Sequence, residues 1–367
     1  MRALIASSAT GGHIYPALAV AEEIVRREPA AEILFVGAKW EINKEIVKAS
    51  GYRQVFIEAE GFDRRNPLKN IAVLAKLAKS SAEIKRIVRD FNPDVCIGTG
   101  GYVSGPVIRI AAKLGVRTVL MEQNVIPGMA NKIAEKYADR VFVAFEDTVK
   151  YFKAPGKVVV SGNPVRSAFS EAAARRGEFR KKYEAPEGSF CILVFGGSQG
   201  ADAINEAGVR LIEELAGRDG FFIILITGRD LFEPILERLK SGPASNTGGY
   251  SVIGYSDAIY ELFAASDLIV SRAGALAVTE IACCGKASIL VPSPNVTNNH
   301  QYFNAKVLAD AGAAVLFTEE QMKEEGLADV TLELAADLKR VDEMGRRAAK
   351  AVKPDAAVVI ADEIFGS

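Results

Sequence analysis

The chain has 367 residues, which is too long for one typical hydrophobic core and indicates two domains. Its 45 basic and 46 acidic side chains give a formal charge of −1, so no global positive field favours nucleic acid as a partner. The four cysteines show no metal-ligand spacing, and the sequence contains neither a signal peptide nor an apolar run of 18 residues. We therefore expect a cytosolic protein that does not span a membrane.

The first half alternates short apolar strands with helices, which predicts a parallel sheet covered on both faces. Strands are expected at residues 3–6, 33–37, 94–97, 118–121, 141–144 and 158–160, and helices at 16–24, 44–50 and 107–114. Glycine-rich turns at 7–13 and 98–106 each follow a strand. Ligands of such sheets bind at the carboxyl ends of the strands, so the polar residues Glu122, Gln123 and Asn124 are candidates for a site.

Residues 62–90 carry eight basic and three acidic side chains, a local charge of +5, among eight aliphatic residues. This composition is typical of a basic amphipathic helix that touches an anionic membrane surface. It is equally typical of a helix that faces the core and has a solvated basic side. The sequence leaves both interpretations open.

After a break at residues 161–164, the pattern starts again in the second half. Strands are expected at 191–195, 221–227, 251–253, 268–271 and 288–292, with helices at 204–215 and 258–265. The polar loop 293–301 follows a strand and is predicted to be a site loop. The tail from residue 329 is helical, and its last piece, 356–365, is expected to pack back on the first domain.

Residues 269–281 read as a buried strand, a tight turn and a helix with one acid, which is the layout of a nucleotide pocket. A helix that begins near Gly274 directs its first N–H groups and its dipole toward a phosphate. Glu280, just over a turn further on, can accept hydrogen bonds from the two hydroxyls of a ribose. The alternative is an ordinary surface carboxylate.

These motifs resemble, in order and spacing, the MurG family, which is the UDP-N-acetylglucosamine:N-acetylmuramyl-(pentapeptide) pyrophosphoryl-undecaprenol N-acetylglucosamine transferase. The match runs from about Arg2 to Gly312. The segments that carry it are Thr10–His13 with Pro16–Ala19, Gly100–Pro106, Glu122–Asn124 with Pro127–Gly128 and Asn131–Lys132, Asn163–Arg166, Phe195–Ala201, Ser271–Leu276 with Glu280, and His300–Gln301 with Asn304–Ala305.

The resemblance implies a glycosyltransferase-B fold, in which two Rossmann-like, doubly wound parallel-sheet domains face a cleft. Residues 1–163 would form the acceptor and membrane-facing domain, with helix 356–365 packed on it, and residues 164–341 the UDP-sugar donor domain. The implied reaction converts Lipid I to Lipid II by an inverting transfer, at the cytoplasmic face of the membrane, without cofactor or metal. The chain has no Asp-x-Asp pair of the kind that holds a metal ion on a pyrophosphate.

By the same resemblance, the donor UDP-N-acetylglucosamine would contact the glycine turns, the Gly274 helix and the site loop. The residues implied are Thr10, Gly11, Gly12, Asn124, Arg166, Ser198, Gln199, Ala275, Leu276, Glu280 and Gln301. The acceptor, undecaprenyl-pyrophosphoryl-muramyl-pentapeptide (Lipid I), would contact Gly100, Gly101, Tyr102 and Ser104.

An inverting transfer needs a general base to remove the proton of the acceptor hydroxyl. His13 is the first candidate, because the dipole of the helix that follows should keep its ring neutral and able to accept. Glu122 is the second. The chain departs from the family pattern at Ser8-Ala9, which implies a looser first turn, and at Ala277, which removes a hydroxyl; neither change touches a residue assigned to the chemistry.

Two other interpretations of the sequence remain. One is another double-Rossmann UDP-sugar enzyme, such as a glycolipid glycosyltransferase or a UDP-sugar epimerase. The other is a nucleotide-binding module without catalysis, which would have little reason to keep His13, Glu122 and the glycine turn at Gly100.

Overall fold

The computed structural model describes residues 1–8, 11–38, 46–58, 69–215, 217–245, 247–324 and 326–366, without the side chains of 69–79. The chain forms two compact units, one of residues Met1–Arg166 with Pro354–Ser367 and the other of Ser167–Lys353. The predicted boundary lay after residue 163. Residues 164–166 therefore belong to the first unit, not to the second as predicted.

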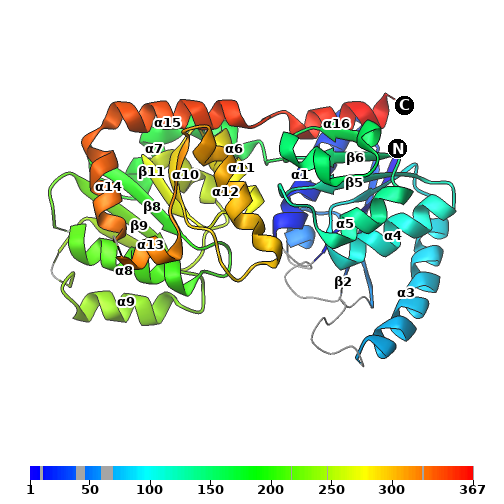
Figure 1. Ribbon diagram of the computed structural model, residues 1–367, viewed down its shortest axis with the longest axis horizontal. Helices are drawn as coiled ribbons and strands as arrows, with labels where there is room; N and C mark the ends of the chain where they lie inside the picture. The colour runs from blue at the N-terminus through cyan, green and yellow to red at the C-terminus, as the bar shows by residue number, and fades with distance from the viewer. Residues whose placement is uncertain are drawn as a thin grey trace. The chain divides into compact units, whose positions relative to one another are not determined.

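The first unit contains the helices labelled α1, α3, α4 and α5 in Figure 1. It is built on a parallel sheet that has seven strands in the described residues, in the order β3-β2-β1-β4-β5-β6-β7. The strands are β1 (Arg2–Ala6), β2 (Glu32–Ala38), β3 (Arg53–Ile57), β4 (Val95–Gly98), β5 (Arg117–Glu122), β6 (Arg140–Val143) and β7 (Val158–Val160). The helices are α1 (Gly11–Arg27), α3 (Lys69–Phe91), α4 (Gly101–Lys113), α5 (Met129–Ala134) and α16 (Ala356–Phe365), with short 3₁₀ turns at Glu135–Tyr137, Glu146–Tyr151 and Pro155–Lys157.

Strand β1 shows why the central strands of this sheet carry apolar residues at consecutive positions. Leu4 and Ala6 belong to a core cluster that includes residues of α3, α4 and α5. Ala3 and Ile5 belong to a second cluster, which includes residues of α1 and α16. Successive side chains of a strand point to opposite faces, so a sheet covered on both faces needs apolar residues at every position.

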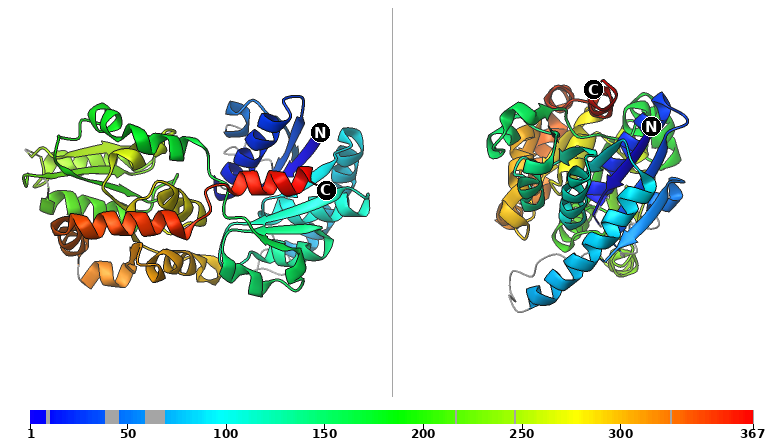
Figure 2. Two further views of the ribbon diagram at one scale, coloured as in Figure 1. Left: turned by 90° about the horizontal axis from the view of Figure 1, so that it is seen from above. Right: turned by 90° about the vertical axis from the view of Figure 1, so that its right-hand side faces the viewer.

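Helix α16 returns from the end of the chain to lie beside α1, as Figure 2 shows. Ile360 is fully buried and Ile364 almost so, in the same cluster as Ile14. Polar contacts support this packing, because Arg27 Nη1 lies 2.6 Å from Asp362 Oδ1 and Arg117 donates to the carbonyl oxygen of Ile364 at 2.8 Å.

The second unit repeats this architecture with a parallel sheet of six described strands, in the order β10-β9-β8-β11-β12-β13. They are β8 (Phe190–Phe195), β9 (Phe221–Ile226), β10 (Tyr250–Ile253), β11 (Leu268–Ser271), β12 (Ala287–Leu290) and β13 (Ala314–Leu316). The helices are α6 (Ala168–Ala172), α7 (Arg176–Lys182), α8 (Asp202–Leu215), α9 (Phe232–Ser241), α10 (Ile259–Ala265), α11 (Ala275–Cys283), α12 (His300–Asp310), α13 (Glu319–Glu324), α14 (Leu327–Ala336) and α15 (Leu338–Ala351). The predicted class, two doubly wound parallel-sheet domains, is confirmed.

The sequence prediction was wrong about where two helices begin. It placed their first residues at Pro16 and at Val107, just after Pro106. In the structure α1 begins at Gly11 and α4 at Gly101, and each contains its proline. The predicted glycine turns are therefore short, and their last residues form the first turns of the two helices.

Candidate functional site

The glycine turns of the first unit lie at the point where its strand order reverses. Strand β1 pairs with β2 on one side and with β4 on the other. Connections therefore leave the carboxyl ends of β1 and β4 in opposite directions, which is where open parallel sheets bind ligands. His13, in the first turn of α1, and Gly100, which precedes α4, both come from this point.

The backbone at Gly100 and Gly101 closely approaches His13 of α1 and Ser8, which follows β1. A side chain at position 100 would place its Cβ 2.9 Å from His13 Cε1, and one at position 101 would place it 1.8 Å from Ser8 Oγ. Both residues also have positive φ, 105° and 75°. Glycine is required at both positions, since only glycine combines this conformation with so close a contact. The turn thus fixes one side of the imidazole.

Gln123, which follows β5, contacts a nitrogen of the His13 imidazole. Its Oε1 lies 3.1 Å from His13 Nδ1. The side chain is almost fully buried, and the backbone oxygen of Gln123 accepts a hydrogen bond from Asn163 Nδ2 at 3.1 Å. The sequence placed Gln123 among the polar residues after a strand but gave it no role, because its partner lies 110 residues away.

Glu122 is buried, and both of its carboxylate oxygens are occupied. Oε1 accepts from the backbone N–H and the side-chain amide of Asn124, at 3.0 and 3.3 Å. Oε2 accepts from the backbone N–H of Gly128 at 3.0 Å and from Asn131 Nδ2 at 2.8 Å. A carboxylate with four donors organises the loop around it and has little capacity left for a substrate proton. This geometry favours His13 over Glu122 as the base.

The other predicted residues of the first unit lie around this edge. Gly11 and Gly12 begin α1, while Thr10 lies outside the described residues. The hydroxyls of Tyr102 and Ser104 are buried with no hydrogen-bond partner among the described atoms, and burial raises the pKa of Tyr102. The guanidinium of Arg166 stacks 4.6 Å above the ring of Tyr15, so this predicted donor residue sits in the first unit.

The second unit has the same kind of switch point, between β8 and β11. Strand β8 pairs with β9 and β11, and the loops that follow β8 and β11 start from this point. Gly274 precedes α11 with no side-chain cap, and a Cβ on Gly274 would meet nothing within 4 Å. The start of α11 therefore faces open space, where the N–H groups of a helix terminus attract an anion. Ser198 and Gln199 are exposed in the loop after β8.

Two further predicted residues lie near this turn. Glu280 is on α11 and only 8% exposed, so it is not the ordinary surface acid of the alternative interpretation. Gln301, at the start of α12, accepts from the backbone N–H of Ser293 at 2.8 Å and so holds the predicted site loop. Asn304 joins α12 to the turn before Gly274 by donating to the oxygen of Ala273 at 3.2 Å.

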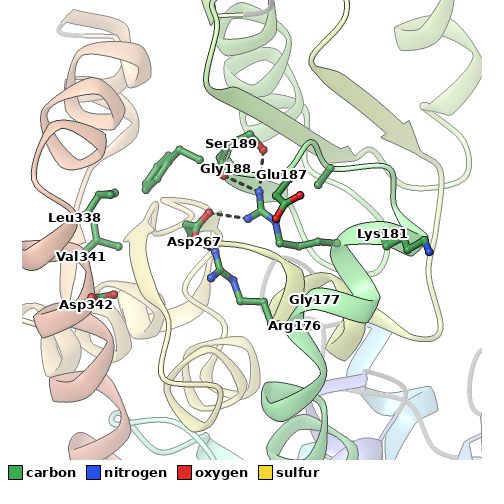
Figure 3. Close-up of a pocket in the computed structure, with 13 residues that line it drawn as sticks. Arg176, Gly177, Lys181, Glu187, Gly188, Ser189, Asp267, Leu338, Val341 and Asp342 are labelled. Carbon is green, nitrogen blue, oxygen red and sulfur yellow. Dashed lines mark hydrogen bonds and ion pairs between the residues drawn. The ribbon is translucent and has the colours of Figure 1, made fainter.

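A concavity of about 800 Å³ lies at the opposite edge of this sheet, where the strands begin. Figure 3 shows Arg176 and Asp267 facing one another in it. Asp267 also accepts from Arg180 at 3.0 Å and from the backbone N–H of Cys191 at 2.8 Å. These charges satisfy one another, so we assign the concavity to the packing of α7 and not to the functional site.

Within the described part of the chain, no group of three or more histidine, cysteine, aspartate or glutamate side chains is placed to hold a metal ion. Among the same residues, no helix combines the length and the apolar character that crossing a bilayer requires.

Comparison with known proteins gives matches along the whole chain. Residues 4–143 match the glycosyltransferase family 28 N-terminal domain, and residues 191–360 match the family 28 C-terminal domain. The protein named UDP-N-acetylglucosamine--N-acetylmuramyl-(pentapeptide) pyrophosphoryl-undecaprenol N-acetylglucosamine transferase from Alkaliphilus metalliredigens is 38% identical over 366 residues, which cover 100% of this chain and 99% of the relative. A Bacillus cereus protein of the same name, numbered 1, is 38% identical over 97% of this chain and 96% of its own.

Solved structures of other proteins have the same fold. MurG of Acinetobacter baumannii superimposes with a TM-score of 0.77 and 27% identity, over 100% of this chain and 99% of the other. The UDP-GlcNAc 2-epimerase of Neisseria meningitidis, solved with UDP-GlcNAc bound, gives a TM-score of 0.71 over 100% of both chains. Because its identity is 13%, that likeness shows the fold alone.

The hydrogen bonds of Glu122 yield a stability prediction. Replacing Glu122 by Gln turns one oxygen into an NH₂ group that faces two donors, so the variant should lose about 1–3 kcal/mol of unfolding free energy. Urea unfolding of the variant measures this loss. The exposed Glu146→Gln exchange is the matched control and should change stability by less than about 0.5 kcal/mol. Equal effects of the two exchanges would show that Glu122 does not organise its loop.

Proposed function

Because the chain belongs to the MurG family of glycosyltransferases, we propose that it transfers N-acetylglucosamine from UDP-N-acetylglucosamine to the muramyl 4-hydroxyl of Lipid I, forming Lipid II. The chain is a UDP-N-acetylglucosamine-dependent hexosyltransferase of peptidoglycan synthesis. The observation that carries this conclusion is 38% identity to a transferase of this name over 366 residues. The two switch-point sites supply the chemistry that such a transfer needs.

The donor is assigned mainly to the second unit. The start of α11, with the backbone of Ala275 and Leu276, takes the pyrophosphate, because helix N-termini stabilise negative charge. Glu280 accepts from the ribose hydroxyls. Ser198, Gln199 and Gln301 supply hydrogen bonds to phosphate and sugar. Thr10, Gly11, Gly12, Asn124 and Arg166 are further donor contacts proposed from the first unit.

The first unit is assigned to the acceptor and to the proton transfer. Gly100, Gly101, Tyr102 and Ser104 form the proposed acceptor contacts. His13 removes the proton of the 4-hydroxyl as its oxygen attacks the anomeric carbon from the side opposite UDP, which inverts that centre. The negative charge that develops on UDP is stabilised at the start of α11. Glu122 acts indirectly, by holding the loop that carries Gln123.

A lipid-linked acceptor requires the first unit to approach an anionic membrane from the cytoplasmic side. The predicted basic segment, 62–90, is described only in part: residues 62–68 and the side chains of 69–79 lie outside the described set. In the part that is described, Ile84 and Val88 are buried in the core while Lys85 and Arg86 are exposed. In this part, α3 is a helix that faces the core and has a solvated basic side. The proposed membrane contact of α3 therefore rests on residues 64–79.

A second surface of the first unit supports membrane contact. Met129 and Ile133, on one side of α5, are 55% and 59% exposed. Lys132 lies between them with its Nζ 5.1 Å from the ring centre of Tyr151. Exposed aliphatic side chains beside lysine and tyrosine suit the interface of an anionic bilayer.

A turnover assay distinguishes the proposed transferase from a UDP-sugar epimerase. With a short-chain Lipid I analogue, the protein should release UDP and yield a product that is heavier by one N-acetylglucosamine residue. Without acceptor, it should release UDP slowly or not at all. Mass spectrometry and a UDP assay measure both. Formation of an epimerised sugar or rapid UDP release without acceptor would instead indicate a UDP-sugar epimerase.

The His13→Ala exchange should lower kcat by about 10² to 10⁴, the usual contribution of a general base. The affinity for UDP-N-acetylglucosamine should hardly change, because the donor binds mainly to other residues. Steady-state kinetics and calorimetry separate the two effects. Glu122→Gln is the comparison, and a larger loss of kcat in that variant would exchange the two roles.

Reversing Lys69, Lys76 and Lys79 to Glu should reduce sedimentation with anionic vesicles, since each basic residue near such a surface contributes on the order of 1 kcal/mol. Activity on a long-chain lipid acceptor should fall more than activity on a short-chain soluble analogue. Lys132→Glu with Ile133→Glu tests the α5 surface in the same way. If activity falls equally with both acceptors, or if neither the substitutions nor added salt change vesicle binding, membrane contact lies elsewhere.

A further inference from the structure

We propose that Gln123 is a positioning residue that holds His13 as the tautomer with its proton on Nδ1 and its lone pair on Nε2. The proposal deepens the proposed function and rests on His13 as the general base. In this tautomer Nδ1–H donates to the Gln123 amide oxygen, so Nε2 is the nitrogen that can accept the proton of the acceptor hydroxyl.

The orientation of the Gln123 amide is set by its own surroundings. Its Nε2 lies 3.5 Å from the carbonyl oxygen of Met121, which can only accept a hydrogen bond. The opposite orientation would set the amide oxygen against that carbonyl oxygen, and two acceptors repel. The oxygen therefore faces His13 Nδ1, at 3.1 Å. A ring nitrogen opposite an amide oxygen must carry the proton to form a hydrogen bond.

The parts of this arrangement are held independently. Asn163 donates to the backbone oxygen of Gln123 at 3.1 Å, and the neighbouring Glu122 is fixed by its four donors. The missing side chain of Gly100 leaves the space that the imidazole occupies, since a Cβ there would lie 3.0 Å from His13 Nδ1. Both the ring and the acceptor of its proton are thus positioned before substrate binds.

The contact matters because a neutral imidazole in water prefers its proton on Nε2. That form would present an N–H, and not a lone pair, to the acceptor hydroxyl. An amide oxygen selects the other tautomer without bringing a negative charge to the ring. A carboxylate at position 123 would select the same tautomer but would also stabilise the imidazolium.

The composition of the chain makes the tautomer measurable. The chain has two histidines, His13 and His300, so long-range ¹H–¹⁵N spectra of histidine-labelled protein contain two sets of ring signals. The nitrogen that bears the proton resonates far from the one that carries the lone pair. His300→Gln assigns the signals. His300 Nδ1 lies 2.8 Å from the Thr297 oxygen in the second unit, so it is an internal reference that Gln123 variants should not disturb.

In the resting protein, at a pH where both rings are neutral, His13 should carry its proton on Nδ1. Gln123→Leu should move His13 toward the Nε2–H form, while Gln123→Glu should keep the proton on Nδ1. The backbone oxygen that Asn163 contacts is present in both variants. An Nε2–H signal for His13 in the wild-type protein, or the same tautomer in wild type and Gln123→Leu, would overturn the proposal. If Gln123→Leu does not fold, the wild-type spectrum still decides.

Kinetics give a second readout. Gln123→Leu should lower kcat by about 10- to 100-fold, less than the loss of the base itself, with little change in KM for UDP-N-acetylglucosamine. Gln123→Glu should recover most of this kcat at alkaline pH. Equal kcat in wild type and Gln123→Leu would contradict the positioning role. The spectra need no turnover, so the two proposals can fail separately. If His13 carries its proton on Nδ1 but the His13→Ala variant keeps full kcat, His13 is not the general base and the tautomer assignment still holds.

Discussion

The close approach of the Gly100–Gly101 backbone to His13 is the contact on which the proposed chemistry depends. It is possible because β1 and β4 are neighbours in the sheet, because Gly100 has no side chain to fill the space of the ring, and because Gly101 has none to collide with Ser8. A Cβ at position 100 would lie 2.9 Å from His13 Cε1 and 3.0 Å from His13 Nδ1, so the ring or the turn would have to shift. The proposed proton transfer therefore depends on the order of the strands and on the backbone conformation of Gly100 and Gly101.

In the proposed function, each unit uses its switch point to bind a different substrate. At the switch point of the first unit, a helix begins beside a polar cluster whose hydrogen bonds fix an imidazole. At the switch point of the second, α11 begins with Gly274 facing open space, which suits a phosphate. The first arrangement can move a proton, and the second can stabilise the charge of a leaving diphosphate.

The sequence predicted the central strands and both glycine turns, because their apolar runs and glycines are local signals. It missed β3 and β13, since each is a short strand at the edge of its sheet and Arg53 and Gln54 interrupt the apolar pattern of β3. It also left the choice between His13 and Glu122 open. That choice depends on the donors around Glu122 and on Gln123, whose contact with His13 spans 110 residues and leaves no local pattern.

We propose that the second unit holds most of the nucleotide while the first supplies the base. A crystal structure with UDP-N-acetylglucosamine bound tests it most directly. We expect the ribose beside Glu280 and the pyrophosphate at the start of α11. A nucleotide found instead against His13 and the Gly100 turn, with Glu280 making no contact to it, would contradict the assignment of the two sites.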